Sequence, residues 1–257
     1  MQDQFIEGIH NYCDRWCERC PFTAQCEVYA AEQGLTEDEK DPTKPAFWLN
    51  LKKNFEEILE SLNEKMAELG IEMDDDDQTP EPEPDPAVVA REEQMREAAL
   101  HYGRSVEAFF KDNTTFFEQK NEELAEQIED SRPVDLESLQ FFQDAVEVIR
   151  WYQYFIAAKI DRSVGGLGKA DKDDDFAQSD ANGSAKIAMI ALERSLGAWE
   201  VVVRRLPEKQ EEIRELQHQL QHLRAKMLEL FPNWRVFHRP GFDDHPQNTL
   251  RLDFNPN

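Results

Sequence analysis

The stretch IAMIALERSLGAWEVVV, residues 187–203, decides the class of fold, because its seventeen positions hold only three charged side chains. A helix that is apolar on nearly all its faces has to be buried among other elements. The stretch VIRWYQYFIAA, residues 148–158, has the same character, with one charged residue in eleven. We therefore expect two helices, 134–162 and 184–206, to form the most buried pair of a helical protein.

Two further helices complete the expected bundle. One covers residues 87–130, with a break near Asp112–Asn113, and the other covers residues 207–231 with its apolar positions along one side. The chain has only ten glycines, which argues against a turn-rich β fold. The pattern predicts an all-α, up-down helical bundle over residues 87–231, with Ser184 as the N-cap of the third helix.

The remaining parts of the chain are expected to lie on either side of this bundle. Residues 1–70 form a small N-terminal module that contains four cysteines and an amphipathic helix over 46–69. Residues 71–86 form an acidic linker, because the stretch EMDDDDQTPEPEPDP at 72–86 has eight acids, four prolines and no basic side chain. Residues 232–257 lack periodicity and are expected to pack as an irregular tail on the surface.

The charge of the chain restricts its partners. A formal charge of −25 disfavours both nucleic acid and an anionic membrane surface, since phosphate groups attract lysine and arginine. No apolar run approaches the ~18 residues of a membrane span, so we expect a cytoplasmic protein. A redox or regulatory partner protein is the expectation, and the sequence leaves the oligomeric state open.

All the cysteines of the chain fall within NYCDRWCERCPFTAQCEVY, residues 11–29. They are Cys13, Cys17, Cys20 and Cys26, spaced C-x3-C-x2-C-x5-C and named here the four-cysteine motif. Thiols stay reduced in the cytoplasm, so clustered cysteines there indicate a metal site more than disulfides. Apolar and thiol side chains recur every three or four positions from residue 3 to residue 20, which predicts a helix ended by Pro21.

A zinc ion and an iron–sulfur cluster are the two main alternatives for the motif. Structural zinc sites with four cysteines usually use two C-x2-C pairs, and this chain has one, Cys17 and Cys20. In a continuous helix Cys13 and Cys20 would also stand about 10 Å apart along the axis, too far to share one small ion. A [4Fe–4S] cluster tolerates wider spacing, and a proline directly after a ligand is common in ferredoxin motifs. Aromatic residues flank the thiols and are able to exclude water: Tyr12, Trp16, Phe22 and Tyr29.

The segment CERCPFTAQC resembles the C-x2-C-x5-C part of two iron–sulfur groups, the auxiliary-cluster domains of radical-SAM enzymes and the RecB-like nucleases that carry a cluster. The resemblance covers Cys17, Cys20 and Cys26 and implies the ligand type without an activity. The spacing Cys13-x3-Cys17-x2-Cys20 also matches radical-SAM ligands. That chemistry needs an open iron, which Cys26 would occupy, and a barrel of parallel strands that this sequence does not offer.

Two longer stretches resemble a family of helical bacterial proteins for which no activity is established. They are DANGSAKIAMIALERSLGAW, residues 180–199, and FPNWRVFHRPGFD, residues 231–243. This resemblance implies relatedness over most of the chain and carries no site residues.

Other polar groups are weaker candidates for chemistry. We expect His218 and His222 on the solvent side of the last helix, and Glu193 and Glu200 as an exposed stripe. Residues 169–183 imitate a calcium loop but lack its glycine and its final glutamate, so we reject calcium.

The sequence therefore predicts an iron–sulfur protein with a [4Fe–4S] cluster on the four-cysteine motif, working in electron transfer or redox sensing. One alternative is a structural or protein-interaction module whose fold is stabilised by a zinc ion, without redox chemistry. Another is an iron–sulfur enzyme whose active site lies near Trp151, Tyr152 and Trp199. We find no catalytic constellation, so the sequence leaves enzyme activity open and leans against it.

Overall fold

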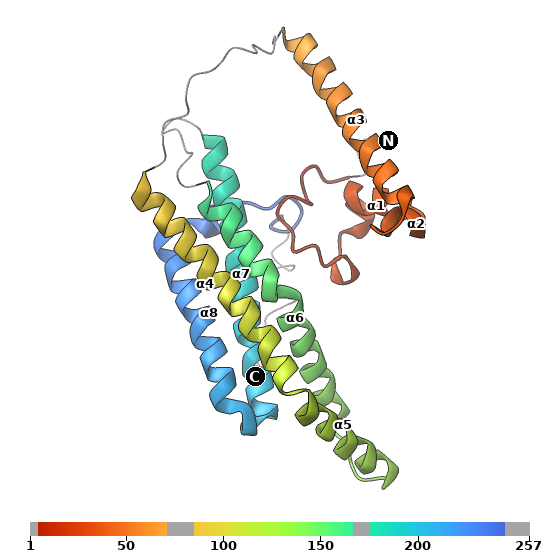
Figure 1. Cartoon of the computed structure of the whole chain (residues 1–257), viewed down its shortest axis with the longest axis vertical. Helices are drawn as coiled ribbons and strands as arrows, with labels where there is room; N and C mark the ends of the chain where they lie inside the picture. Colours follow the sequence, from red (N-terminus) through yellow and green to blue (C-terminus); the bar gives the residue numbers. More distant parts are fainter. Residues whose placement is uncertain (1–4, 71–84, 167–174, 245–257) are drawn as a thin grey trace. The chain divides into compact units, whose positions relative to one another are not determined.

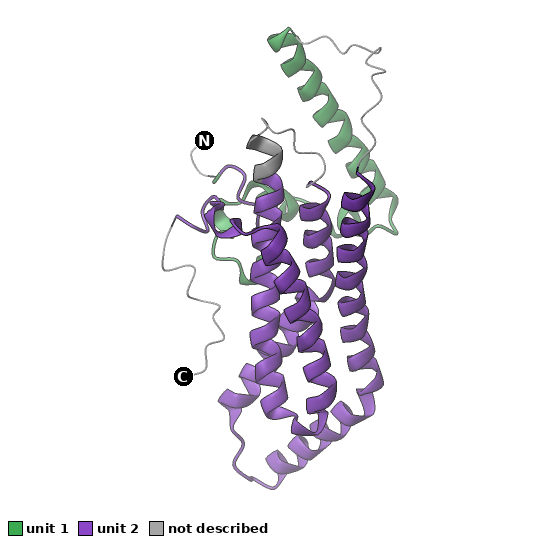
Figure 2. Cartoon of the chain, turned by 90° about the vertical axis from the view of Figure 1, so that its left-hand side faces the viewer, with its two compact units in different colours: residues 1–6, 17–83 green, residues 7–16, 84–257 purple. Residues whose placement is uncertain are grey.

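The computed structural model describes residues 5–70, 85–166 and 175–244, the first five residues of the last range by their backbone alone. Every regular element in these ranges is a helix, which confirms the all-α bundle. The chain divides into two compact units, residues 1–6 with 17–83 as unit 1 and residues 7–16 with 84–257 as unit 2 (Figure 2). Each unit is considered by itself.

The described residues of unit 1, 5–6 and 17–70, form two 3-10 turns and three helices. The turns are η2 (Cys17–Arg19) and η3 (Thr23–Gln25), and the helices are α1 (Glu27–Gln33), α2 (Glu37–Lys40) and α3 (Pro45–Leu69). Thr36 caps α2 through a reciprocal capping box with Glu39. The long helix α3 has proline in its first turn and ends at Gly70, whose left-handed φ of 65° suits a glycine C-cap. The predicted helix over 46–69 is therefore confirmed.

Unit 2 is the helical bundle. Its helices are α4 (Pro86–Asp112), α5 (Thr114–Glu129), α6 (Leu136–Val164), α7 (Asp175–Arg205) and α8 (Gln210–Leu230). Helices α4, α6, α7 and α8 lie side by side in alternating directions, and α5 continues past the end of α4 (Figure 1). The 3-10 turn η4 (Pro207–Lys209) joins α7 to α8.

Asn113 separates α4 from α5, as the sequence predicts. Its side-chain amide donates to the Phe109 carbonyl and to the Glu212 carboxylate, both at 2.9 Å. The residue is buried, and its amide adds a second donor to the Phe109 carbonyl, which already accepts the Asn113 backbone N–H at 3.2 Å, while joining the break to α8. The break therefore has a tertiary partner as well as a local cause.

The core of the bundle is centred on α6 and α7, the pair expected to be most buried. The largest fully buried side chains of these two helices include Tyr152, Ile149, Ile156, Ile160, Met189, Leu192 and Trp199. Gly103 of α4 lets the ring of Tyr154 on α6 approach closely, because a Cβ there would lie 2.7 Å from a ring carbon. The Trp199 indole donates to the buried Tyr102 hydroxyl at 3.1 Å, which satisfies both polar groups.

The start of α7 differs from the prediction, because the helix begins at Asp175 and not at Ser184. Ser184 is buried inside the helix, where its hydroxyl lacks a hydrogen-bond partner. A Cβ at Gly183 would lie 2.3 Å from the Tyr12 ring and 2.7 Å from the Phe237 ring. Gly183, predicted to lie just before the helix, thus allows close packing against these two rings. The predicted loop over 169–183 lies partly outside the described residues.

The predicted helix over residues 3–20 is wrong for all its described positions. Residues 5–16 run through turns, and Gly8 and Arg15 have left-handed φ values of 70° and 58° that interrupt helical backbone. Ile9, one of the periodic apolar residues, is 2% exposed in unit 2. Residues 7–16, named here the N-terminal strap, are therefore shaped by tertiary packing and not by helix periodicity.

The described part of the chain after α8, residues 231–244, is irregular apart from the 3-10 turn η5 (Trp234–Val236). Phe231 and Trp234 are buried against the bundle. The Lys186 ammonium of α7 donates to the Phe237 carbonyl at 2.5 Å and pairs with Asp243 at 2.6 Å. These contacts attach residues 231–244 to α7. No helix in the described ranges is long and apolar enough to cross a lipid bilayer.

Candidate metal centre

The division of the chain into two units falls within the sequence of the four-cysteine motif. Cys13 belongs to the N-terminal strap of unit 2, and Cys17, Cys20 and Cys26 belong to unit 1. All four thiols lie in the described part of the chain, all are half-buried, and no disulfide joins them. The disulfide alternative finds no support here.

The three cysteines of unit 1 are placed by short turns. Cys17 begins η2, and the Cys20 backbone N–H closes this turn on the Cys17 carbonyl at 3.1 Å. The Cys26 N–H closes η3 on the Thr23 carbonyl at 3.3 Å, and Cys26 is also the N-cap residue of α1. The Phe22 N–H donates to the sulfur of Cys20 at 3.4 Å. Amide donors of this kind stabilise a thiolate and tune metal–sulfur sites.

The described residues contain no group of three or more cysteine, histidine, aspartate or glutamate side chains gathered closely enough to hold a metal ion. This applies to Cys17, Cys20 and Cys26, although all three lie in the same unit. The four thiols are donors of the type that both iron–sulfur clusters and zinc ions bind. Local backbone hydrogen bonds set the turns that carry Cys20 and Cys26.

Cys13 has a more enclosed environment. Its thiol donates to the His10 carbonyl at 3.4 Å. Burial raises the pKa of the Cys13 thiol, which the backbone N–H of Arg15 and the nearby Lys159 offset only in part. Burial also lowers the pKa of the Lys159 ammonium. Burial therefore favours the neutral thiol at this position.

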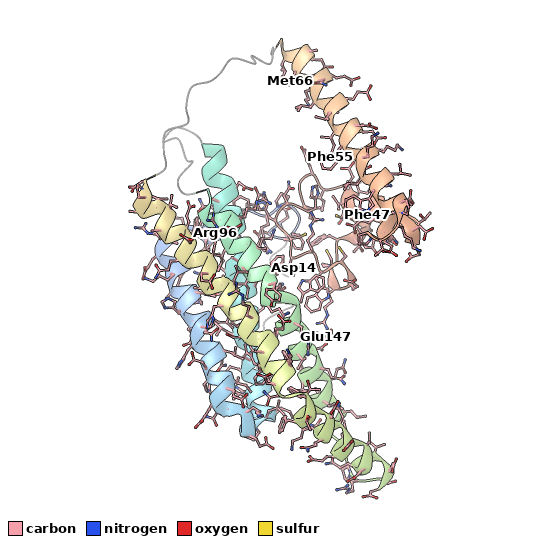
Figure 3. All side chains as sticks on the ribbon, in the orientation of Figure 1. Asp14, Phe47, Phe55, Met66, Arg96 and Glu147 are labelled. Carbon is pink, nitrogen blue, oxygen red and sulfur yellow. The ribbon has the colours of Figure 1, made fainter. Side chains whose placement is uncertain are left out.

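Asp14 anchors the strap to the bundle directly beside Cys13. Its carboxylate accepts a hydrogen bond from the Tyr152 hydroxyl at 2.6 Å and pairs with Arg194 at 2.9 Å (Figure 3 labels Asp14). Its carbonyl accepts from the Trp151 indole at 3.0 Å, and Trp16 stacks on that indole with centroids 5.0 Å apart. The pKa of Tyr152 is raised, chiefly by burial, so its hydroxyl stays protonated and remains a donor at neutral pH.

Tyr12, on the other side of Cys13 from Asp14, provides a second anchor. The Tyr12 hydroxyl donates to Asp180 at 3.1 Å, and Asp180 pairs with Arg162 at 2.6 Å. The Tyr12 ring lies over Gly183 and meets the Phe237 ring edge-on, with centroids 4.5 Å apart. Both flanks of Cys13 are thus held on α6 and α7.

The predicted aromatic flanks of the motif take different roles. Phe22 is buried, whereas Tyr12 and Trp16 pack on the bundle as described above. Trp199, named with Trp151 and Tyr152 in the enzyme alternative, contacts Phe109 with ring centroids 5.3 Å apart. It belongs to the bundle core, whereas Trp151 and Tyr152 contact the strap.

The weaker candidates lie on the surface. His218 and His222 are exposed, as predicted. The Glu193 and Glu200 side chains are 39% and 43% exposed, and each is paired with an arginine of α8. Neither pair has the character of an acid–base site.

Sequence reasoning missed the polar cluster of Asp14, Tyr152 and Arg194. Its one available sign was Arg194 itself, a charged residue in a helix predicted to be buried almost all round. A charge in such a helix requires a partner, but nothing in the sequence indicates that the partner is 180 residues away.

Comparisons of the chain with protein-family models, curated proteins and solved structures gave no match. The functional argument therefore depends on the four-cysteine motif and its surroundings.

Proposed function

We propose that the four-cysteine motif binds a [4Fe–4S] cluster, and that the protein transfers electrons or senses redox state for a partner protein in the cytoplasm. One observation carries the proposal. All four cysteines of the chain lie within fourteen positions, half-buried and without a disulfide, on backbone that is not α-helical between Cys13 and Cys26. Compact runs of four cysteine thiolates are the usual ligands of such clusters.

Binding requires the turns between Cys17 and Cys26 to rearrange. The backbone hydrogen bonds that close these turns span three residues each, so they are local and are remade at small cost. Metal sites in small modules often form only when the metal binds, and the binding energy then becomes folding energy. On this proposal the four thiols come together only when the metal binds.

The chain's own groups fit the redox role. Four thiolate ligands would leave no iron open to a substrate, which favours electron transfer or sensing over catalysis. The Phe22 N–H, which donates to Cys20 at 3.4 Å, is placed to stabilise negative charge on that sulfur. The anchored Asp14 joins the motif to the core of the bundle through its neighbour Cys13.

The first test is the metal content of protein purified without oxygen. We expect a brown protein with broad visible absorbance and about four irons per chain. Replacing Cys20 with serine should abolish the colour and leave the helical content of the bundle unchanged by circular dichroism. Ser163, a buried serine of α6, offers a control in which a cysteine is added instead of removed. Ser163→Cys places a thiol outside the motif and should not alter the iron content.

Zinc is the second candidate, and one finding favours it. The expected helix over residues 3–20 had argued against zinc because it would separate the thiols, and residues 5–20 contain no α-helix. A zinc ion would stabilise the fold of unit 1 by cross-linking its cysteines, without redox chemistry. A colourless protein with one zinc per chain would establish this alternative and refute the cluster. The Cys20→Ser variant would then lose local structure in unit 1 without loss of any redox signal.

A further inference from the structure

Helix α3 presents a long apolar stripe that its own unit leaves uncovered. The helix has 25 residues and none is buried (Figure 3 labels Phe47, Phe55 and Met66 along it). The stripe includes residues seven positions apart, whose exposed fractions are 59% for Trp48, 59% for Phe55, 51% for Leu62 and 67% for Leu69. Ile58 and Leu59, between them, are 62% and 57% exposed. Contiguous exposed apolar surface of this kind marks an interaction site.

The charges of α3 are distributed unequally along its length. Residues 45–55 carry Lys52 and Lys53 and no acid, whereas residues 56–69 carry five glutamates and one lysine. The first half therefore has a charge of +2 and the second half −4, from five acids and one base. The helix dipole adds to this separation of positive and negative charge only in the first and last turns of α3. The helix is thus complementary to a second copy of itself in reverse orientation.

We propose that two copies of this chain associate through α3, with the two helices antiparallel and their apolar stripes in contact. A seven-residue repeat of apolar residues is the pattern of helices that pair along their length. The antiparallel orientation places the lysine half of each helix beside the glutamate half of the other. A parallel pair would place like charges together, which is unfavourable.

The same charges argue against a lipid surface as the occupant. Amphipathic helices that lie on membranes carry mainly lysine and arginine on the polar face. The polar side of α3 carries five glutamates against three lysines. An anionic membrane would repel this face, whereas a second α3 complements it.

The first experiment measures the mass of the full-length protein by sedimentation equilibrium and light scattering. We expect twice the chain mass of 30.0 kDa. Leu62→Asp should raise the dimer dissociation constant by roughly tenfold or more, because it buries an unpaired carboxylate in an apolar contact. Asn63→Asp adds the same charge about 100° around the helix, off the stripe, and should leave the dissociation constant nearly unchanged.

The second experiment tests the orientation by carbodiimide cross-linking, which joins a lysine directly to a carboxylate. Lys53 and Glu68 of one straight helix lie about 22 Å apart, beyond the reach of a direct link. A Lys53–Glu68 cross-link in the dimer band therefore reports the antiparallel pair. Lys53→Glu should remove this link and weaken the dimer, with a smaller effect at high salt.

Three results would overturn the proposal. One is a monomer at every accessible concentration. This result includes a monomer in which the rest of the chain protects α3 from hydrogen exchange. Another is a dimer that Leu62→Asp does not weaken although circular dichroism shows the variant folded. The third is a set of cross-links that join equivalent ends of the two helices. Metal content has no part in any of these readouts, so they do not depend on the proposed cluster.

Discussion

At the scale of single residues, Asp14 has the most connected side chain of the N-terminal strap. It pairs with Arg194 at 2.9 Å and accepts from Tyr152 at 2.6 Å, and its side chain is only 23% exposed. Replacing it with alanine leaves the Arg194 guanidinium and the Tyr152 hydroxyl without this partner in a mostly dry site. We expect Asp14→Ala to lower the free energy of unfolding by about 1–3 kcal/mol.

The measurement is urea unfolding of metal-free protein, followed by tryptophan fluorescence, which also reports the Trp16–Trp151 stack. Glu97→Ala is the matched control, because Glu97 pairs with Arg104 at 3.0 Å but the two side chains are 65% and 58% exposed. We expect about 0.5 kcal/mol or less for this control. Equal effects of the two substitutions would show that the strap is not anchored through Asp14.

At the scale of elements, the attachment of residues 231–244 to α7 depends on the charge of Asp243. Burial alone would raise the pKa of Asp243, but hydrogen bonds from Arg239 and Lys186 outweigh it and lower the pKa to about 2, from 3.8. A carboxylate with a lowered pKa in the folded state stabilises that state above pH 3.8. The stabilisation is lost as the pH falls from about 4 towards 2.

The shift predicts that Asp243→Asn costs at most about 2 kcal/mol of folding free energy near neutral pH. The difference between the two proteins should be constant above about pH 5 and should shrink steadily on acidification below it. Chemical denaturation across this pH range is the measurement. A difference that stays constant down to pH 2 would mean that the ionised carboxylate contributes nothing to the attachment.

The helices of the bundle were predictable because their residues follow helical periodicity and their ends carry local signals. Asn113 and Gly70 end helices at the expected positions. The same reasoning failed where tertiary contacts determine the backbone. Gly183 and Ser184 resemble a helix start, but Gly183 allows the close packing of Tyr12 and Ser184 is buried inside α7. The strap has helical spacing but follows the bundle surface.

The four cysteines stand out in the sequence as a set of candidate ligands, whereas their surroundings do not. Four thiols at close spacing are visible in any reading of the sequence. Their division between two units is not, because the boundary between Trp16 and Cys17 depends on contacts that Asp14 makes with α6 and α7. Interactions across more than a hundred residues leave no local pattern.

At the scale of the whole molecule, the two units differ in how they are stabilised. Unit 2 holds almost all the buried apolar side chains. Among the described residues of unit 1, Phe22 is the one apolar side chain in the buried class. A segment of this size without a core depends on cross-links, metals or association for its stability. The proposed metal and the proposed dimer would supply two such constraints at different places in unit 1.

Removing both constraints should therefore unfold unit 1 and leave unit 2 intact. We expect chelator-treated Leu62→Asp protein, under limited proteolysis, to be cut within residues 17–69 while the bundle helices remain as a stable fragment. Hydrogen exchange should show α3 amides exchanging far faster than those of α6 and α7, since local opening of an exposed helix costs little free energy. Protein that is loaded with metal and dimeric should resist cleavage at the same sites. If the treated variant were equally resistant, unit 1 would possess a stability of its own that neither constraint explains.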